Sequence, residues 1–185
     1  MKVMKGMEEA WASKNESYFI RVLKQEPGLV LRVHAVCILA EVGGKKCVPT
    51  LSDVLFHDPD PLVRHEAAFS LGQIGLPSGN RALCIAMKQD RDPIVRHESA
   101  AALGSIGSPE SEAPLRNALS DKEEMVRNSA RASLFNIQFL NRERKKARAV
   151  SMTGEGRDSA PPKRRGGTIS PLSSKLSRPR RRPTP

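Results

Sequence analysis

Two His-Glu pairs, His65-Glu66 and His97-Glu98, are the residues of this sequence whose types and spacing are best suited to chemistry. The first pair lies in the stretch DPLVRHEAAFSLGQIG, and the second lies in DPIVRHESAAALGSIG, a copy of that stretch 32 residues later. Two neutral imidazoles with carboxylates form a nitrogen and oxygen ligand set that suits Fe(II), Mn(II) or Zn(II). The second ring nitrogen of each histidine needs a carboxylate or carbonyl partner, which an adjacent glutamate can supply. The four residues are therefore candidate metal ligands.

Both pairs occupy the same position of a repeated helix. The apolar residues of its first complete copy recur at helical spacing: Val63, Ala67, Leu71 and Ile74. His65 points away from this apolar stripe, and His97 does the same in the next copy. Because helices pack about 8–10 Å apart, two histidines on adjacent helices can converge on one ion. Gly72 and Gly104 follow on the same side, and we expect them to leave room in front of the histidines.

A simpler explanation competes with a metal site. Repeats that arise by duplication copy surface residues as well as core residues, so both pairs can be inherited residues on a solvated face. Glutamate near the start of a helix also favours the helix dipole without any metal. The other two histidines are interpreted as structural, since His34 is in register with Glu66 and His57 falls in a turn.

The elements that position these pairs are copies of one helical unit. The repeated arginines are separated by 32, 32 and 31 residues: Arg32, Arg64, Arg96 and Arg127. A fixed period in this range is typical of a stacked helical array. In each copy a first helix, such as 45–56 or 79–89, leads into an Asp-Pro turn that can cap a second helix. Gly75 follows that second helix as a stop signal. The sequence thus predicts an all-α fold, an α-solenoid of about four helix pairs.

Charge divides the chain into a neutral body and a basic tail. Residues 1–140 carry 17 Lys or Arg and 17 Asp or Glu, so the net charge of +11 lies entirely in the residues that follow. We assign 1–15 to an N-terminal segment, 16–146 to the repeat domain and 147–185 to the tail. The tail is rich in Pro, Ser, Gly and Arg and has few large apolar residues, so it is predicted to be disordered.

The tail and the cysteines indicate the surroundings of the protein. PPKRR and RPRRRP can act as a nuclear-import signal or make weak nucleic-acid contact, although a purely solubilising extension explains the same composition. The three cysteines lack CxxC spacing, and Cys37 is expected in the core. We expect no signal peptide, since the sequence shows no such pattern, and no apolar run reaches the roughly 20 residues of a membrane span. We expect a cytoplasmic protein, which the tail can direct to the nucleus, and no membrane partner.

The stretches VRHEAAFSLGQIG and VRHESAAALGSIG resemble the HEAT-like repeats of deoxyhypusine hydroxylase. The fold of that family is an α-solenoid in two similar halves, each with two consecutive His-Glu motifs, which together bind a di-iron centre. In each half a repeat without the motif precedes the pair and another follows it. The order is the same here, with LRVHA before the pair and MVRNSA after it. The resemblance covers roughly residues 16–140 and corresponds to one half of the enzyme.

The resemblance implies an iron-dependent monooxygenase that hydroxylates a deoxyhypusine side chain on a translation factor. Carried over residue by residue, it makes His65, His97 and Glu98 candidate iron ligands, and Glu66 a ligand or a catalytic contact to the substrate amine. This chain has two His-Glu motifs where the family enzyme has four. Either two chains assemble as a homodimer to form the di-iron centre, a single Fe(II) is used, or catalysis is absent.

The main alternative comes from another class of protein. HEAT-like repeats that resemble the phycobilisome-lyase type mostly serve as protein-binding scaffolds. Under this interpretation the concave face binds another protein, and the basic tail adds electrostatic attraction. The iron content of the purified protein separates the two hypotheses.

Overall fold

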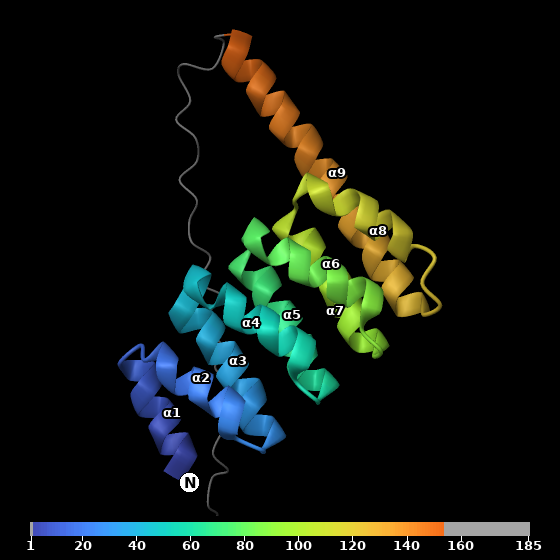
Figure 1. Cartoon of the computed structure of the whole chain (residues 1–185). Helices are drawn as coiled ribbons and strands as arrows, with labels where there is room; N and C mark the ends of the chain where they lie inside the picture. The colour runs from blue at the N-terminus through green and yellow to red at the C-terminus, as the bar shows by residue number, and fades with distance from the viewer. Residues whose placement is uncertain (1, 154–185) are drawn as a thin grey trace, which may run out of the picture. The chain divides into compact units, whose positions relative to one another are not determined.

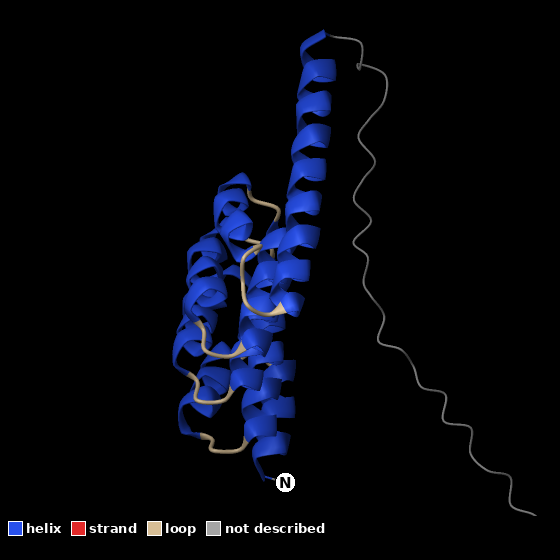
Figure 2. Ribbon diagram, turned by 90° about the vertical axis from the view of Figure 1, so that its right-hand side faces the viewer, coloured by secondary structure: helices blue, strands red, loops and turns tan. Residues whose placement is uncertain are grey.

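The computed structural model of the chain describes residues 2–153. These residues form helices joined by turns, with no strand among them (Figures 1 and 2). The α-helices are α1 Lys2–Ala12, α2 Glu16–Gln25, α3 Leu29–Gly43, α4 Val48–His57, α5 Pro61–Ile74, α6 Asn80–Gln89, α7 Pro93–Ile106, α8 Glu112–Ala118 and α9 Glu124–Thr153. Short 3-10 helices precede three of them: η1 Gly44–Cys47, η2 Pro77–Gly79 and η3 Pro109–Ser111.

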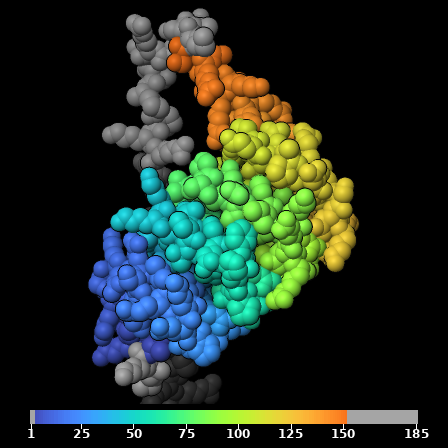
Figure 3. All heavy atoms as spheres, in the orientation of Figure 1, coloured from blue at the N-terminus to red at the C-terminus, as the bar shows by residue number. Residues whose placement is uncertain are grey.

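The helices of the compact unit Met1–Arg148 form four consecutive pairs, α2–α3, α4–α5, α6–α7 and α8–α9. In the first three pairs the helices pack on each other, and the second helices also pack in series, α3 on α5 and α5 on α7. In the fourth pair, Asn141 of α9 donates a hydrogen bond to Glu112 of α8 at 3.0 Å. Figure 2 shows the two layers that result, and Figure 3 shows the segments of this unit following one another in chain order. The prediction of an all-α solenoid of four helix pairs is confirmed.

The predicted Asp-Pro turns start the second helices. The side chain of Asp60 accepts a hydrogen bond from the backbone N–H of Leu62 at 2.9 Å, and Pro61 is the first residue of α5. Asp92 caps α7 in the same way. An aspartate at this position satisfies a backbone N–H that has no partner within the helix, while proline has no N–H to lose there. The local sequence therefore determines where each second helix begins.

Glycines end α5 and α7, but not α9. Gly75 and Gly107 have φ angles of 69° and 66°, the left-handed conformation that glycine adopts without strain at a helix C-terminus. The equivalent position of α9 is Gln138, which continues the helix to Thr153. The boundary predicted at residue 146 consequently falls inside a helix, and residues 147–153 are helical rather than disordered. The remaining tail residues, 154–185, lie outside the described part of the chain.

The N-terminal segment is also part of the folded unit. Within 1–15, α1 packs against α2 and α3. The Tyr18 hydroxyl donates a hydrogen bond to the carbonyl of Val3 at 3.2 Å, and Met7 and Ala10 are buried. The repeats thus have an additional helix against their first pair.

A continuous apolar core runs through the stacked pairs. Its largest fully buried side chains are Phe19, Leu39, Leu51, Leu55, Leu71, Leu83, Leu103, Leu115 and Ile137. The predicted stripe of α5 is confirmed, since Val63, Ala67 and Leu71 are buried. The helices approach so closely that a Cβ atom at Gly72 would lie 2.9 Å from the Cα of Ala102. Gly72 and its counterpart Gly104 therefore allow close helix packing. The prediction that they leave room in front of the histidines is wrong.

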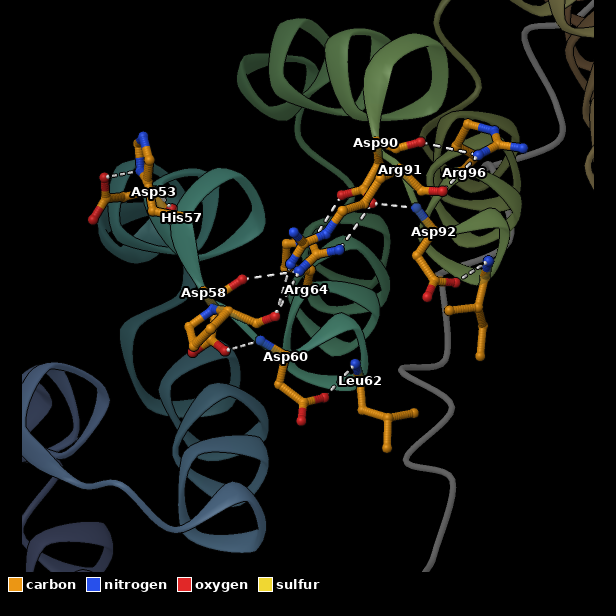
Figure 4. A network of polar contacts seen from close by, with 12 residues as sticks. Asp53, His57, Asp58, Asp60, Leu62, Arg64, Asp90, Arg91, Asp92 and Arg96 are labelled. Carbon is orange, nitrogen blue, oxygen red and sulfur yellow. Dashed lines mark hydrogen bonds and ion pairs between the residues drawn. The ribbon is translucent and has the colours of Figure 1, made fainter.

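Arginine–aspartate pairs lock each repeat to the next. Arg64 donates from Nε and Nη2 to the two carboxylate oxygens of Asp90, at 2.8 and 2.9 Å (Figure 4). Its Nη1 also donates to the carbonyls of Asp58 and Pro59, at 2.9 and 3.2 Å. Each buried guanidinium thus joins its own turn to the turn of the following repeat, and this charge-assisted fork is a strong form of hydrogen bonding.

The same arrangement occurs three times, and we call it the Arg–Asp ladder. Its members are Arg32 with Asp58, Arg64 with Asp90 and Arg96 with Asp121. The hydrogen bond from Arg96 holds the pKa of the Asp121 carboxyl below its usual value. The ladder maintains the register of the repeats, and with it the relative positions of the His-Glu pairs.

Candidate metal centre

The first His-Glu contact joins two neighbouring repeats. His65 Nε2 on α5 lies 3.3 Å from Glu98 Oε2 on α7. The side chains are 27% and 14% exposed, so the histidine is half-buried rather than freely solvated. The hydrogen bond to Glu98 raises the pKa of His65, against the opposing effect of burial. The prediction that residues of the two motifs share one face is confirmed for this pair.

The separation within this pair is compatible with a shared ion. Nitrogen and oxygen ligands lie about 2.0–2.2 Å from an ion such as Zn²⁺, so two of them at ordinary coordination angles are about 3.0–3.4 Å apart. The 3.3 Å between His65 Nε2 and Glu98 Oε2 falls in that range. An ion can therefore replace the proton between these atoms with little movement of either side chain.

The second histidine makes the equivalent contact with the last helix. His97 Nδ1 lies 2.6 Å from the hydroxyl oxygen of Ser129 and 3.4 Å from the carbonyl oxygen of Met125. Ser129 occupies the register position of Glu98, so His97 faces α9 as His65 faces α7. Both contacts of His97 use its Nδ1 atom, so Nε2 is the ring nitrogen that can bind a ligand.

Glu66 is held by a cysteine from the preceding repeat. The Cys37 thiol donates a hydrogen bond to Glu66 Oε1 at 3.1 Å. Partial burial of the sulfur, with the hydrogen bond and charge of Glu66, raises the pKa of Cys37 to about 12. The residue is exposed and borders a groove of about 440 Å3 between α3 and α5, so the prediction of a core cysteine is wrong. The helix turn that carries it faces the groove, and the thiol remains protonated at neutral pH.

These contacts do not yet form a complete ligand set. Within residues 2–153, no three His, Cys, Asp or Glu side chains come together as a group able to hold a metal ion. His65 and Glu98 are adjacent, whereas His97 and Glu66 have other partners. The donor types suit Fe(II), but one chain places two donors together. The four-residue metal site remains a prediction.

The other two histidines do not belong to the His-Glu pairs. His34 is exposed on α3, and His57 is exposed at the end of α4, where its Nδ1 lies 2.9 Å from Asp53 Oδ1. They provide matched controls for experiments on His65 and His97.

The residues that sequence reasoning missed are the aspartates of the ladder. The arginines were noticed only as markers of the repeat period. Their partners follow 26, 26 and 25 residues later in the next Asp-Pro-type turn. A search for opposite charges that recur with the repeat at a constant offset could have found them.

No helix within residues 2–153 combines the length and the apolar character that crossing a membrane would require.

Comparison with known proteins identifies the repeats. Residues 18–83 and 80–158 match the family model of HEAT repeats. The solved structure of human deoxyhypusine hydroxylase in complex with glycerol is similar to this chain, with a TM-score of 0.62 and 29% sequence identity. The match covers 68% of this chain and 44% of the human protein, so the chain spans less than half of that enzyme's length. Comparison with curated proteins gives no match.

Proposed function

This chain belongs to the HEAT-repeat family, and we propose that it is a deoxyhypusine hydroxylase-like module whose His-Glu face binds Fe(II). The observation that carries the proposal is the 3.3 Å contact between His65 of one repeat and Glu98 of the next. Duplicated surface residues without a role need not meet across a helix interface. The likeness to the human enzyme supports the same assignment.

The proposed reaction is the O2-dependent hydroxylation of a deoxyhypusine side chain on a translation factor. His65, His97 and Glu98 would hold the iron, which would supply the oxygen chemistry when bound. Glu66 lies beside His65 in the same turn of α5, and its carboxylate would pair with the positively charged amine of the substrate. The metal ligands and the residue that contacts the substrate therefore come from two consecutive repeats.

We infer that a second copy of the chain completes the centre. One chain brings two donors together, and the human relative is more than twice as long as the matched region. A two-fold symmetric dimer uses the same surface on both subunits, so the two His-Glu faces would meet and combine their ligands. Iron that binds only the dimer would stabilise it by mass action.

Anaerobic Fe(II) titration of the full chain tests the metal site. We compare wild type with a His65→Ala, His97→Ala variant and with a His34→Ala, His57→Ala variant, which also loses two histidines. The first variant should lose iron binding, whereas the second should bind iron like wild type, because neither His34 nor His57 belongs to the two His-Glu pairs. Equal binding by both variants would contradict the assignment.

Solution mass and product analysis test the assembly and the reaction. Wild type should change from monomer to dimer when Fe(II) is added, and the His65→Ala, His97→Ala variant should stay monomeric. With iron, O2 and a reductant, the wild-type protein should add one oxygen atom to a deoxyhypusine-containing protein, detected by mass spectrometry. A wild-type protein that binds no iron and stays monomeric would reject both proposals.

A protein-binding scaffold is the second candidate function. It is favoured by the pairing of these side chains within the chain, where the Cys37 thiol donates a hydrogen bond to Glu66 and His97 contacts the hydroxyl of Ser129. In that case the histidines act as links between repeats, and removing them lowers the stability of iron-free protein while iron has no effect. Thermal unfolding with and without Fe(II) distinguishes the two functions.

A further inference from the structure

The last helix carries different residues where it would meet another repeat. In α5 and α7 the positions that pack against the following second helix are glycines, Gly72 and Gly104, both buried. The equivalent position of α9 is Phe135, which is 68% exposed. Arg131, also exposed, replaces the buried Ala100 of α7. The side of α9 that corresponds to an internal contact is therefore open, aromatic and basic.

Another repeat of the same geometry cannot cover this side. A single Cβ atom at Gly72 would already lie 2.9 Å from the backbone of Ala102. A phenylalanine ring at the equivalent position 135 would keep a following helix from packing as α7 packs on α5. The open side of α9 thus calls for an occupant other than a HEAT helix.

The ladder also ends here, with an arginine that pairs with no aspartate within residues 2–153. Arg127 donates from Nη1 to the carbonyls of Asp121 and Lys122, both at 2.8 Å, as the earlier arginines do in their own turns. Those arginines also bind a carboxylate of the next repeat, whereas no carboxylate among residues 2–153 bonds to Arg127. Its free edge matches a carboxylate or phosphate.

Five exposed residues at helical spacing define what we call the α9 end face: Arg131, Phe135, Phe139, Arg142 and Lys146. They lie opposite the side of α9 that packs on α7, where the Ser133 hydroxyl donates to the carbonyl of Ala100 at 2.8 Å. From its first residue to its last, the face extends about 22 Å, at 1.5 Å per residue. One carboxylate, Glu143, adjoins it and contacts Lys146 at 2.8 Å.

A basic groove continues this surface. It has a volume of about 650 Å3, and its basic lining residues are Arg142, Arg144, Lys145 and Arg148. Its acidic lining residue, Glu112, accepts a hydrogen bond from the Asn141 side chain at 3.0 Å. Helix α9 as a whole has seven Lys or Arg and two Glu. The partner of this surface must therefore be negatively charged.

We propose that the α9 end face binds single-stranded nucleic acid. Unpaired bases would stack on Phe135 and Phe139, while phosphates would contact Arg131, Arg142 and Lys146. Aromatic rings next to positive charges are the combination by which single strands are bound without sequence preference. A second copy of the chain does not fit, because two basic faces would repel each other. A duplex does not fit either, since its paired bases cannot stack on the rings.

Fluorescence anisotropy with the full chain tests the stacking. The probe is a labelled oligouridylate of about 12 nucleotides, within the usual range of single-strand sites. The Phe135→Ala, Phe139→Ala variant should bind at least about tenfold more weakly than wild type, from the loss of two stacked bases. The control is Phe56→Ala, Phe69→Ala, which removes two phenylalanines that are 40% and 42% exposed elsewhere. It should bind like wild type.

The salt dependence of binding tests the charges. Removing two phosphate contacts with Arg142→Gln, Lys146→Gln should reduce the slope of log affinity against log salt by about 1.4. Lys45→Gln, Lys46→Gln removes two exposed charges away from α9 and should leave the slope unchanged. The basic tail is present in every variant, so its contribution cancels in these comparisons.

Two results would overturn the proposal. One is wild-type affinity for the oligouridylate in the Phe135→Ala, Phe139→Ala variant with an unaltered circular-dichroism spectrum. The other is a polyglutamate probe that binds more tightly than the oligouridylate and loses affinity in that variant, which would identify an acidic protein as the partner. Neither result depends on iron binding by the His-Glu face.

Discussion

Helices α5 and α7 differ from α9 at the positions where each meets, or would meet, the following repeat. The inner helices have a glycine for close packing and an arginine whose aspartate lies in the next turn. In α9 the glycine is replaced by Phe135, and Arg127 has only carbonyl partners within residues 2–153. The comparison teaches that one side of each repeat encodes whether another repeat can follow it.

The largest effect should come from breaking the ladder inside the array. Arg96→Met removes the buried partner of Asp121 and should lower the free energy of unfolding by about 3–5 kcal/mol. Arg127→Met loses only hydrogen bonds to carbonyls and should cost about 1 kcal/mol. Urea denaturation of both variants measures the difference. Equal losses would show that the carboxylate contributes little to the inner position.

Placing the terminal residue at an inner position should be the next most damaging change. Gly72→Phe must push the backbone of Ala102 away and should cost about 3 kcal/mol, at the upper end of overpacking effects. Gln73→Phe introduces the same side chain at the neighbouring exposed position and serves as its control. Thermal unfolding compares the two. If they unfold at the same temperature, the close approach at Gly72 is not required.

The ladder should make stability depend on acid. The pKa of Asp121 is lower in the folded protein than its ordinary value of 3.8, so its contribution is fully present above that value. It is lost as the pH falls through the folded-state pKa. Asp121→Asn should therefore cost about 2 kcal/mol near pH 6, with the difference from wild type shrinking below about pH 4. The free energy of unfolding of both proteins is measured across this pH range. A difference between wild type and Asp121→Asn that did not change with pH would contradict the prediction.

The smallest effect on stability is expected at the end of the array. Phe135→Ala removes a ring that is 68% exposed, and exposed substitutions usually change stability by less than about 0.5 kcal/mol. A calorimetric scan of this variant should coincide with that of wild type. A loss comparable to that of Gly72→Phe would mean that Phe135 packs against part of the folded chain.

Much of the fold could be predicted because its signals are local. The Asp-Pro turn at Asp60, the apolar spacing of α5 and the glycine at position 75 each act within a few residues, and each appears in the structure as expected. The end of the last helix was misplaced for a local reason as well. Gln138 replaces the stop glycine of the earlier copies, and the basic composition that follows was interpreted as disorder although it is compatible with a helix.

The candidate site was only partly predictable, because its contacts cross between helices. The phase of α5 predicts the side on which His65 emerges, and its contact with Glu98 agrees with the prediction of a shared face. Helical phase cannot show that Ser129 takes the Nδ1 atom of His97, or that Cys37 reaches Glu66. Those contacts depend on the offset between neighbouring helices, which close packing at the glycines and the Arg–Asp pairs determine.

The direction of the ladder has a consequence for synthesis on the ribosome. Each arginine precedes its aspartate by 25 or 26 residues, so it is always made first. At about 5–20 residues per second, the aspartate follows some seconds later, after the arginine can bind the carbonyls of its own turn. In a nascent chain that pauses between repeats, the Nε and Nη2 atoms of the last arginine have no carboxylate partner yet. Such a group is attracted to anionic surfaces. Each later repeat supplies the carboxylate for the arginine before it, and among the ladder arginines within residues 2–153 Arg127 is left with carbonyl partners alone.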